Sequence, residues 1–184
     1  IQSDLILTSC TFANNTCSNS IGGGTPIDFS TSITLTYSEC LFENNSAVYV
    51  AGPDDENSGY NGIGGASHIG YKDPQKSIDV IYSRCRFIRN KSDYEGGAIA
   101  IQTTGDCTID DCWFEGNVAG AKLSTRSAQT LAFPAGRQYL GCGGAIYIDP
   151  DFQSDLDKKL ELTISACTFI ENQAVNGHAI FIRN

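Results

Sequence analysis

The chain has 184 residues, of which 41% are hydrophobic and 18% charged, and this composition excludes an intrinsically disordered protein. A formal net charge of -9 excludes nonspecific binding to nucleic acid, because an acidic chain repels a phosphate backbone. No apolar run reaches the ~18 residues of a membrane-spanning helix, so we expect no membrane insertion by this segment. The length predicts a single domain over residues 1–184, or one slice of a longer array.

A repeat of the form Cys-x-Phe-x-x-Asn organises the sequence and occurs five times. A segment of alternating apolar residues precedes each motif, as in Ile78, Val80 and Tyr82. A glycine-led segment that ends in isoleucine follows it, as in Gly96 to Ile101. Alternation with a period of two residues predicts strands, so each repeat predicts a unit of three short strands.

In chain order the repeats predict five coils, at residues 4–27, 33–69, 78–101, 107–148 and 160–184. Three short strands cannot bury an inner face alone, so stacked coils must share a core, and a parallel β-helix is the natural solution. Each motif position then becomes a column of stacked residues. The predicted aromatic column is Phe12, Phe42, Phe87, Phe114 and Phe169. The predicted amide ladder is Asn15, Asn45, Asn90, Asn117 and Asn172.

The pairing of Phe-x-x-Asn with Gly-Gly-Ala-Ile, as in 87–90 and 96–99, resembles the repeats of polymorphic outer membrane proteins. These are surface-exposed right-handed β-helices of chlamydiae and other microbes. The resemblance runs from about Asp4 to Asn184, and it implies a cell-surface adhesin with an extracellular location. The expected fold is thus an all-β, right-handed parallel β-helix (solenoid) of about five three-strand coils. Departures such as His178, in place of a glycine, predict that the end coils are distorted or act as interfaces.

The motif cysteines lie two residues before an inward phenylalanine, so we expect their side chains to point inward as well. One interpretation is a column of small buried thiols. The other is oxidation between neighbouring coils, because stacked Cα atoms fall within the ~4.4–6.8 Å range of disulfides. The closest spacing, Cys107-x4-Cys112, does not fit a zinc site, and we expect no resident cofactor.

Two repeats carry long insertions at the same corner, residues 46–63 and 118–142, and such loops commonly carry binding functions in solenoids. Weak calcium candidates in the first are Asp54, Asp55 and Glu56. Basic partner-contact candidates in the second are Lys122, Arg126 and Arg137. The alternative is that two oppositely charged loops merely face each other in solvent.

Outward positions supply the other candidate site residues. Asn14 and Asn44 fit the N-glycosylation pattern and lie beside the ladder, whereas Asn90 fits the pattern but belongs to it. By alternation, four large apolar residues of the second strand should point into solvent and form a partner-contact surface. They are Leu41, Ile88, Trp113 and Ile170. The alternative is that the inserted loops cover them.

No nucleophile, base and orienting residue come together in the pattern, so we expect no catalytic activity. The predicted function is an extracellular structural or adhesive protein that binds itself, a cell-surface protein or a glycan. The alternative is a carbohydrate-active β-helix enzyme of the lyase or hydrolase type, or a glycan-binding module. Because repeat strands lie at both ends, we also expect head-to-tail assembly into a fibre, or continuation into a longer β-helix. A monomer with covered ends is the remaining alternative.

Overall fold

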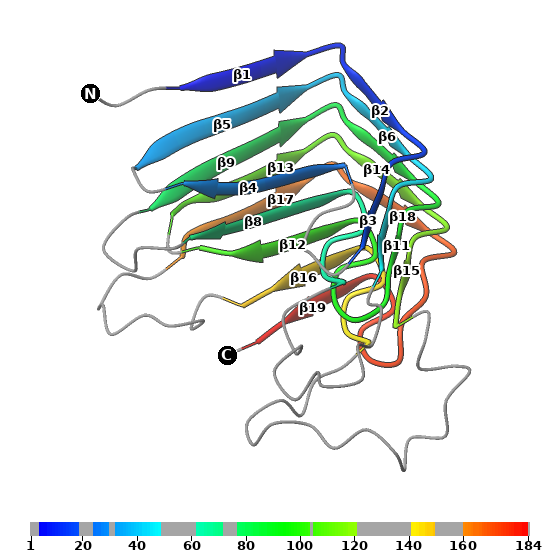
Figure 1. Ribbon diagram of the computed structural model, residues 1–184. Helices are drawn as coiled ribbons and strands as arrows, with labels where there is room; N and C mark the ends of the chain where they lie inside the picture. The colour runs from blue at the N-terminus through cyan, green and yellow to red at the C-terminus, as the bar shows by residue number, and fades with distance from the viewer. Residues whose placement is uncertain are drawn as a thin grey trace.

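The computed structural model describes residues 4–18, 24–29, 32–48, 62–71, 77–103, 105–120, 141–149 and 160–183. Within these ranges the regular structure consists of strands, which pair in parallel to form four sheets. Successive coils stack in chain order, from β1 at one end to β19 at the other (Figure 1). The fold is a parallel β-helix.

Each coil contributes one strand to each sheet, except that the fifth coil has none in the third. The first sheet contains β1 (Leu5–Thr8), β5 (Ile33–Ser38), β9 (Ile78–Ser83), β13 (Cys107–Asp110) and β17 (Leu162–Ser165). The second contains β2 (Thr11–Ala13), β6 (Leu41–Glu43), β10 (Arg86–Ile88), β14 (Trp113–Glu115) and β18 (Thr168–Ile170). The third contains β3 (Thr16–Ser18), β7 (Ser46–Val48), β11 (Lys91–Ser92) and β15 (Val118–Ala119). The fourth contains β4 (Thr25–Phe29), β8 (Ser67–Tyr71), β12 (Ile99–Gln102), β16 (Ile146–Ile148) and β19 (Ile180–Ile182).

The third sheet is a difference from the three-strand coils that the sequence predicts. Its strands span only two or three residues, and in the fifth coil a single bridge between Val118 and Gln173 takes their place. Segments this short and polar, such as Lys91–Ser92, show no hydrophobic alternation. Their strand geometry follows from pairing with the neighbouring coils, which sequence periodicity does not report.

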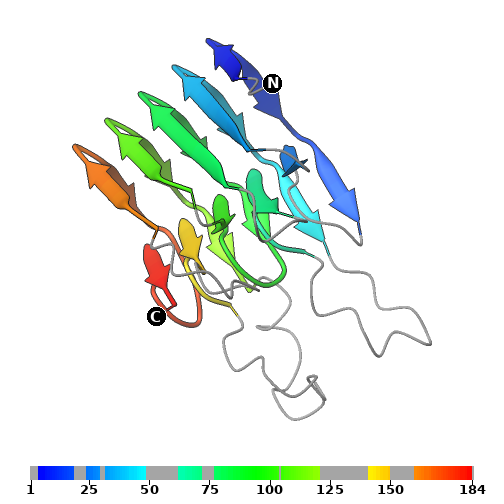
Figure 2. The same cartoon turned by 90° about the vertical axis from the view of Figure 1, so that its left-hand side faces the viewer.

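The predicted columns are present in the register of the sheets. Phe42 pairs with Phe12 and Phe87, and Phe114 pairs with Phe87 and Phe169. Neighbouring rings are stacked with centroid separations of 4.8, 4.7, 4.8 and 4.9 Å. Figure 2 shows the coils lying one behind another, which places equivalent residues in line. The separations match the ~4.8 Å spacing of paired strands, so the backbone sets the aromatic stack.

The asparagine ladder holds one corner of every coil. Asn45 donates from its backbone N and from Nδ2 to Oδ1 of Asn90, at 3.0 Å in both cases. Its Nδ2 also donates to the carbonyl of Phe12 in the preceding coil, at 2.8 Å. The same pattern continues through Asn117 to Asn172. Each internal amide is thereby satisfied in a region without solvent, as buried polar groups require.

Two bends in each coil use the left-handed region of backbone space. The residue after the first strand and the residue before the ladder asparagine have φ between 51° and 63° in all five coils. Most of these positions hold residues other than glycine, such as Glu39 and Arg84. A left-handed residue with a Cβ costs roughly 1–2 kcal/mol, so the ladder and the inter-coil hydrogen bonds must hold these bends in place.

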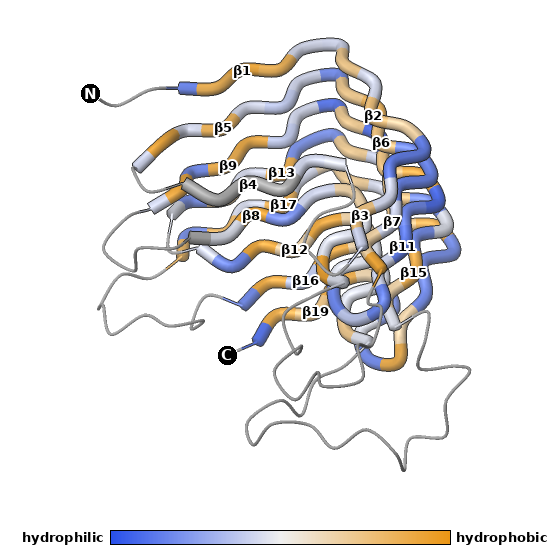
Figure 3. Tube along the Cα trace, in the orientation of Figure 1, coloured by the Kyte–Doolittle hydropathy of each residue, from blue (hydrophilic) through white to orange (hydrophobic). Residues whose placement is uncertain are grey.

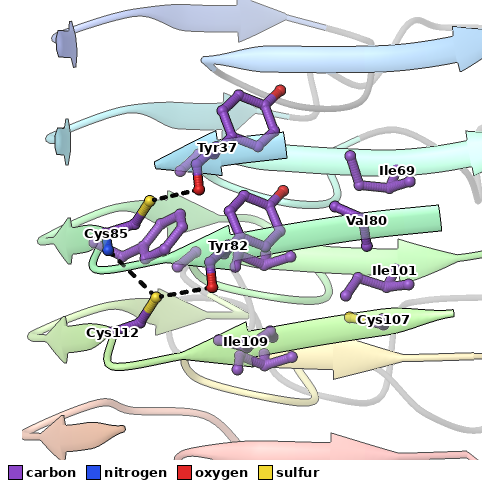
Figure 4. Close-up of a cluster of buried hydrophobic side chains, with 14 of the residues drawn as sticks. Tyr37, Ile69, Val80, Tyr82, Cys85, Ile101, Cys107, Ile109 and Cys112 are labelled. Atoms are coloured by element: carbon purple, nitrogen blue, oxygen red, sulfur yellow. Dashed lines mark hydrogen bonds between the residues drawn. The ribbon is translucent and has the colours of Figure 1, made fainter. Parts of the chain in front are cut away.

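The core fills the inside of the coils and is best protected in the middle of the stack. Figure 3 shows hydrophobic and hydrophilic residues alternating along the strands of the first sheet. Leu35, Val80, Phe87 and Phe114 are fully buried, whereas Phe12 and Phe169 in the end coils are only partly buried. Figure 4 shows the side chains of Tyr37 and Tyr82 on neighbouring strands, whose rings stack at 5.0 Å.

Replacement of Phe87 by alanine removes a ring with packed neighbours on both sides. We expect Phe87→Ala to lower the free energy of unfolding by ~3–5 kcal/mol. The matched control is Phe12→Ala, which removes a partly exposed ring with one stacked neighbour and should cost less. Urea denaturation measures both, and equal costs would contradict the burial gradient along the stack.

Substitution of Asn117 by leucine breaks the ladder in its interior. The variant leaves the backbone N and Nδ2 of Asn90 without their acceptor, so we expect a loss of at least ~2 kcal/mol. Asn15→Leu is the control, because Asn15 lies in the first coil and is exposed. If thermal unfolding gave the same Tm for Asn117→Leu as for the unmodified chain, the ladder would not hold the corner.

Candidate functional site

The motif cysteines point inward and form no disulfide bonds. All eight cysteines are free thiols, so the structure contains none of the disulfides between neighbouring coils that the sequence left open. Each motif Sγ lies near a carbonyl two residues earlier and, in four coils, near a carbonyl of the preceding coil. Figure 4 draws two of the latter contacts, from Cys85 to Tyr37 and from Cys112 to Tyr82. The thiols therefore serve packing and hydrogen bonding rather than crosslinking.

The predicted apolar surface divides into two columns of mixed character. Leu41, Arg86 and Trp113 follow one another in the first column, and Glu43, Ile88 and Glu115 in the second. A charged side chain thus separates the apolar residues of each column, and no continuous apolar ladder is present on this sheet.

Burial divides the predicted contact residues further. Trp113 is 37% exposed and Ile170 is 36% exposed, whereas Leu41 is half-buried. Ile88 is only 7% exposed, so the expectation that it points freely into solvent is wrong. It lies in an internal coil with a glutamate in register on either side, while Ile170 lies in the last coil with one neighbouring strand. The difference in exposure between Ile88 and Ile170 follows from their positions in the stack, which hydrophobic alternation does not report.

Trp113 is fixed on the outer face of the second sheet. Its indole Nε1 donates to Oε2 of Glu115 at 2.9 Å, along the same strand. Arg86 precedes it in the neighbouring coil, and Thr168 follows it. The result is an aromatic ring that is open to solvent and held by a polar contact, with charged and hydroxyl groups beside it.

The glycosylation candidates Asn14 and Asn44 lie one coil apart on the surface. Both are exposed and adopt φ values of 58° and 53°. Asn44 accepts a hydrogen bond from Nε of Arg89 through Oδ1, which leaves its Nδ2 out of that contact. Asn90, which also fits the acceptor pattern, is fully buried in the ladder.

The candidates on the two insertions lie outside the described residues. This applies to Asp54, Asp55 and Glu56, and equally to Lys122, Arg126 and Arg137. Within the described part of the chain, no cluster of three or more His, Cys, Asp or Glu residues could hold a metal ion. The same part of the chain contains no helix long and apolar enough to cross a membrane.

A cluster that the sequence did not indicate lies on the outer face of the fourth sheet. Ala100 and Tyr147 alternate with core residues of β12 and β16, yet both are buried. They pack in a second hydrophobic cluster with Ile63, Tyr94 and Cys142. These covering residues come from the segments that lead into the glycine corners. The face that alternation assigns to solvent is therefore an interior surface.

Polar groups accompany this second cluster. Asp149 is 1% exposed, and its Oδ2 accepts hydrogen bonds from the Tyr147 hydroxyl at 3.1 Å and from Arg183 at 3.0 Å. Its Oδ1 is buried and has no hydrogen-bond partner among the described residues. In an adjacent part of the face, His68 Nε2 lies 2.9 Å from Oε1 of Gln102. Buried groups of this kind are expensive to maintain and often mark functional sites.

The electrostatics of the cluster keep its phenol protonated. Burial raises the pKa of Tyr147 well above its usual value, and the nearby charges of Glu95 and Asp149 raise this pKa further. Asp149 also raises the pKa of Arg183. Burial raises the pKa of the Cys142 thiol to about 11. At neutral pH the Tyr147 phenol and the Cys142 thiol are therefore neutral.

Comparison with known families agrees with this architecture. Residues 2–132 match the family described as right handed beta helix region, and this match covers more than half of the chain. The chain belongs to that family, and its fold is a right-handed parallel β-helix. No curated protein and no solved structure matches the chain.

Proposed function

We propose that this protein is an extracellular structural or adhesive β-helix of the polymorphic outer membrane protein type, and that it binds a cell-surface glycan. The observation that carries the proposal is Trp113, a large aromatic side chain that is 37% exposed on the outer face of the second sheet. An exposed aromatic ring with an apolar neighbour commonly marks a contact surface. Ile170, which is 36% exposed, lies on the same face in the adjacent coil, in register with Glu115.

The chemistry around Trp113 suits a sugar ring. The flat indole offers an apolar face to the C–H face of a pyranose, and the surrounding polar groups can hydrogen-bond its hydroxyls. Arg86 supplies donors, Glu115 supplies an acceptor and Thr168 supplies both. The bond from Trp113 to Glu115 fixes the ring before binding, which lowers the entropy that binding would otherwise cost.

The charge of the chain narrows the class of glycan. A net charge of -9 disfavours acidic polysaccharides, since they would be repelled over the length of the rod. Neutral sugars and amino sugars meet no such barrier. The exposed Asn14 and Asn44 are consistent with an extracellular location, because both fit the glycosylation pattern and are accessible.

A second candidate function rests on a different observation. Asp149 holds Tyr147 and Arg183 on Oδ2, while its Oδ1 has no hydrogen-bond partner among the described residues. A carboxylate and a phenol can donate or accept a proton, and a guanidinium can stabilise developing negative charge, which are roles that polysaccharide hydrolysis or elimination needs. Because Asp149 and Tyr147 are buried, we would look for carbohydrate-active chemistry where this covered face opens to solvent at Arg183, whose side chain is 37% exposed.

One titration series tests the glycan proposal. Trp113 is the only tryptophan, so its fluorescence reports binding at this position without a label. We expect neutral or amino-sugar oligosaccharides to shift its emission, and Trp113→Ala to weaken binding measured by calorimetry at least about tenfold. Ile6→Ala, which removes an exposed apolar residue from the first sheet, is the control and should leave affinity unchanged.

Activity assays on the same proteins distinguish an adhesive function from a catalytic one. Reducing-end and unsaturated-product assays on neutral and acidic polysaccharides, with and without calcium, should show no turnover if the chain only binds. Turnover that is lost in Asp149→Asn but retained in Trp113→Ala would replace the adhesive proposal by the enzymatic one. If Trp113→Ala left the affinity for oligosaccharides unchanged, the second sheet would not be the glycan-binding surface.

A further inference from the structure

Two inward columns change residue type along the stack, whereas the motif columns do not. The motif positions hold cysteine, phenylalanine and asparagine in every coil. One inward column of the first sheet reads Leu7, Tyr37, Tyr82, Ile109 and Ile164. One inward column of the fourth sheet reads Thr25, Ser67, Ile99, Ile146 and Ile180. Hydroxyl groups therefore lie inside the first three coils, at positions where the fourth and fifth coils hold isoleucine.

One pair of these hydroxyls joins the second coil to the third. Ser67 Oγ lies 2.8 Å from the hydroxyl oxygen of Tyr82, and both residues are fully buried. Thr25 of the first coil donates from Oγ1 to Ser67 Oγ at 3.1 Å. Burial raises the pKa of Tyr82 well above its usual value, so at neutral pH the phenol is protonated and can donate to Ser67 or accept from it. The Tyr82 side chain thus crosses the core from the first sheet to the fourth and ends on a hydrogen bond in the preceding coil.

Tyr37 provides a comparison at the same position of the second coil. It pairs in register with Tyr82, is equally buried, and stacks on its ring at 5.0 Å. Figure 4 shows the two rings parallel, with both hydroxyl oxygens on the same side. Burial raises the pKa of Tyr37 to about 12, and the nearby hydroxyls of Thr25 and Ser67 oppose this rise, yet the Tyr37 hydroxyl forms no hydrogen bond within the part of the chain that the structure describes. The hydrogen bond between coils therefore belongs to Ser67 and Tyr82, and not to every tyrosine of the column.

The identical motif columns leave the order of the coils open. A phenylalanine ring or a ladder amide fits the same position of any other coil, so these columns tolerate a chain in which one coil is left out. Misassembly is a characteristic failure of repeat proteins. If the fourth coil stacked directly on the second, the aromatic stack would be retained, but Ile109 would take the place of Tyr82. Ser67 would then lose its phenol, and the shorter side chain would leave a cavity.

The reverse exchange is also unfavourable. If the third coil followed the third or fourth coil of a second copy, Tyr82 would meet Ile99 or Ile146 in place of Ser67. The larger side chain would overpack the core, and the phenol hydroxyl would be buried without a partner. Both errors are therefore penalised at this one pair of positions.

We propose that Ser67 and Tyr82 form an ordering pair: their match in size and in hydrogen bonding selects the third coil as the one that stacks on the second. Single buried polar contacts fix register in this way in coiled coils. The motif columns supply a geometry common to all coils, and the ordering pair supplies the identity of one step in the stack. The proposal is independent of glycan binding, because both side chains lie in the core whereas Trp113 is exposed.

A double-mutant cycle tests the pair itself. We would measure the equilibrium constant of unfolding in urea for Ser67→Ala, Tyr82→Phe and the double variant. We expect the two single effects to be non-additive by at least about threefold, because either substitution alone already breaks the hydrogen bond. The matched control combines Ser67→Ala with Tyr37→Phe, which removes a hydroxyl without a hydrogen bond to any described residue. In the control, the two effects on the equilibrium constant should multiply.

Hydrogen exchange after refolding tests the ordering. Ser67→Ile combined with Tyr82→Ile gives the second and third coils the isoleucines of the later coils and removes the distinction between them. We would refold this variant from urea and follow peptides from residues 78–101 by mass spectrometry. We expect an unprotected population of these peptides at least about tenfold more abundant than in the unmodified chain. Tyr37→Phe should show no increase in this population.

Several results would overturn the proposal. One is additive effects in the cycle of Ser67 and Tyr82, or coupling of the same size in the Tyr37 control. Another is a double isoleucine variant that refolds to a single protected population. A double isoleucine variant that does not fold would show that the pair stabilises the stack rather than ordering it, which also contradicts the proposal.

Discussion

Parallel backbone hydrogen bonds between coils fix a separation that leaves no room for a side chain at the glycine corner, and the rest of the structure follows from this constraint. The second glycine of each corner donates its N–H to the next coil, at 3.0 Å for Gly65 and Gly97 and 3.1 Å for Gly144. The same separation stacks the phenylalanine rings, closes the ladder of asparagines and lets each buried thiol reach a carbonyl of the preceding coil. A change of spacing at one column would therefore disturb all the others.

The constraint also explains how function can be placed on this scaffold. At the inward motif positions the residue type is fixed by stacking in the columns. Residue types therefore differ between coils chiefly at outward positions and at the corners. Trp113 is such a variation, because the equivalent position in other coils holds Thr11, Leu41, Arg86 or Thr168. Asp149 and Arg183 are another such variation, since a buried carboxylate and a partly exposed guanidinium pair between neighbouring coils.

The sequence predicts the inward columns well because each depends on a residue type at a fixed interval. Phe87 and Asn90 follow Cys85 at the same distances in every coil, and in-register stacking converts that spacing directly into contact. Burial on the outside is set by other segments and is not periodic. Nothing near Ile88 in the sequence indicates that glutamates flank it in the neighbouring coils. Likewise, nothing near Tyr147 in the sequence indicates that Ile63 and Tyr94 pack with it. The third sheet escaped prediction because two residues are too few to show a period.

Gly97→Ala tests most directly whether the coils are packed against one another at this distance. The added methyl would lie 2.0 Å from the carbonyl oxygen of Gly144 and 2.6 Å from the backbone nitrogen of Val118. Gly116→Ala is the matched control: its φ is 63°, but its Cβ would meet only the Arg89 side chain at 3.5 Å. Chemical denaturation should show that Gly97→Ala loses at least about 3 kcal/mol or fails to fold, and that Gly116→Ala loses about 1–2 kcal/mol. A Gly97→Ala protein with an unchanged Tm would contradict in-register stacking at the corner, and with it the basis of the structure.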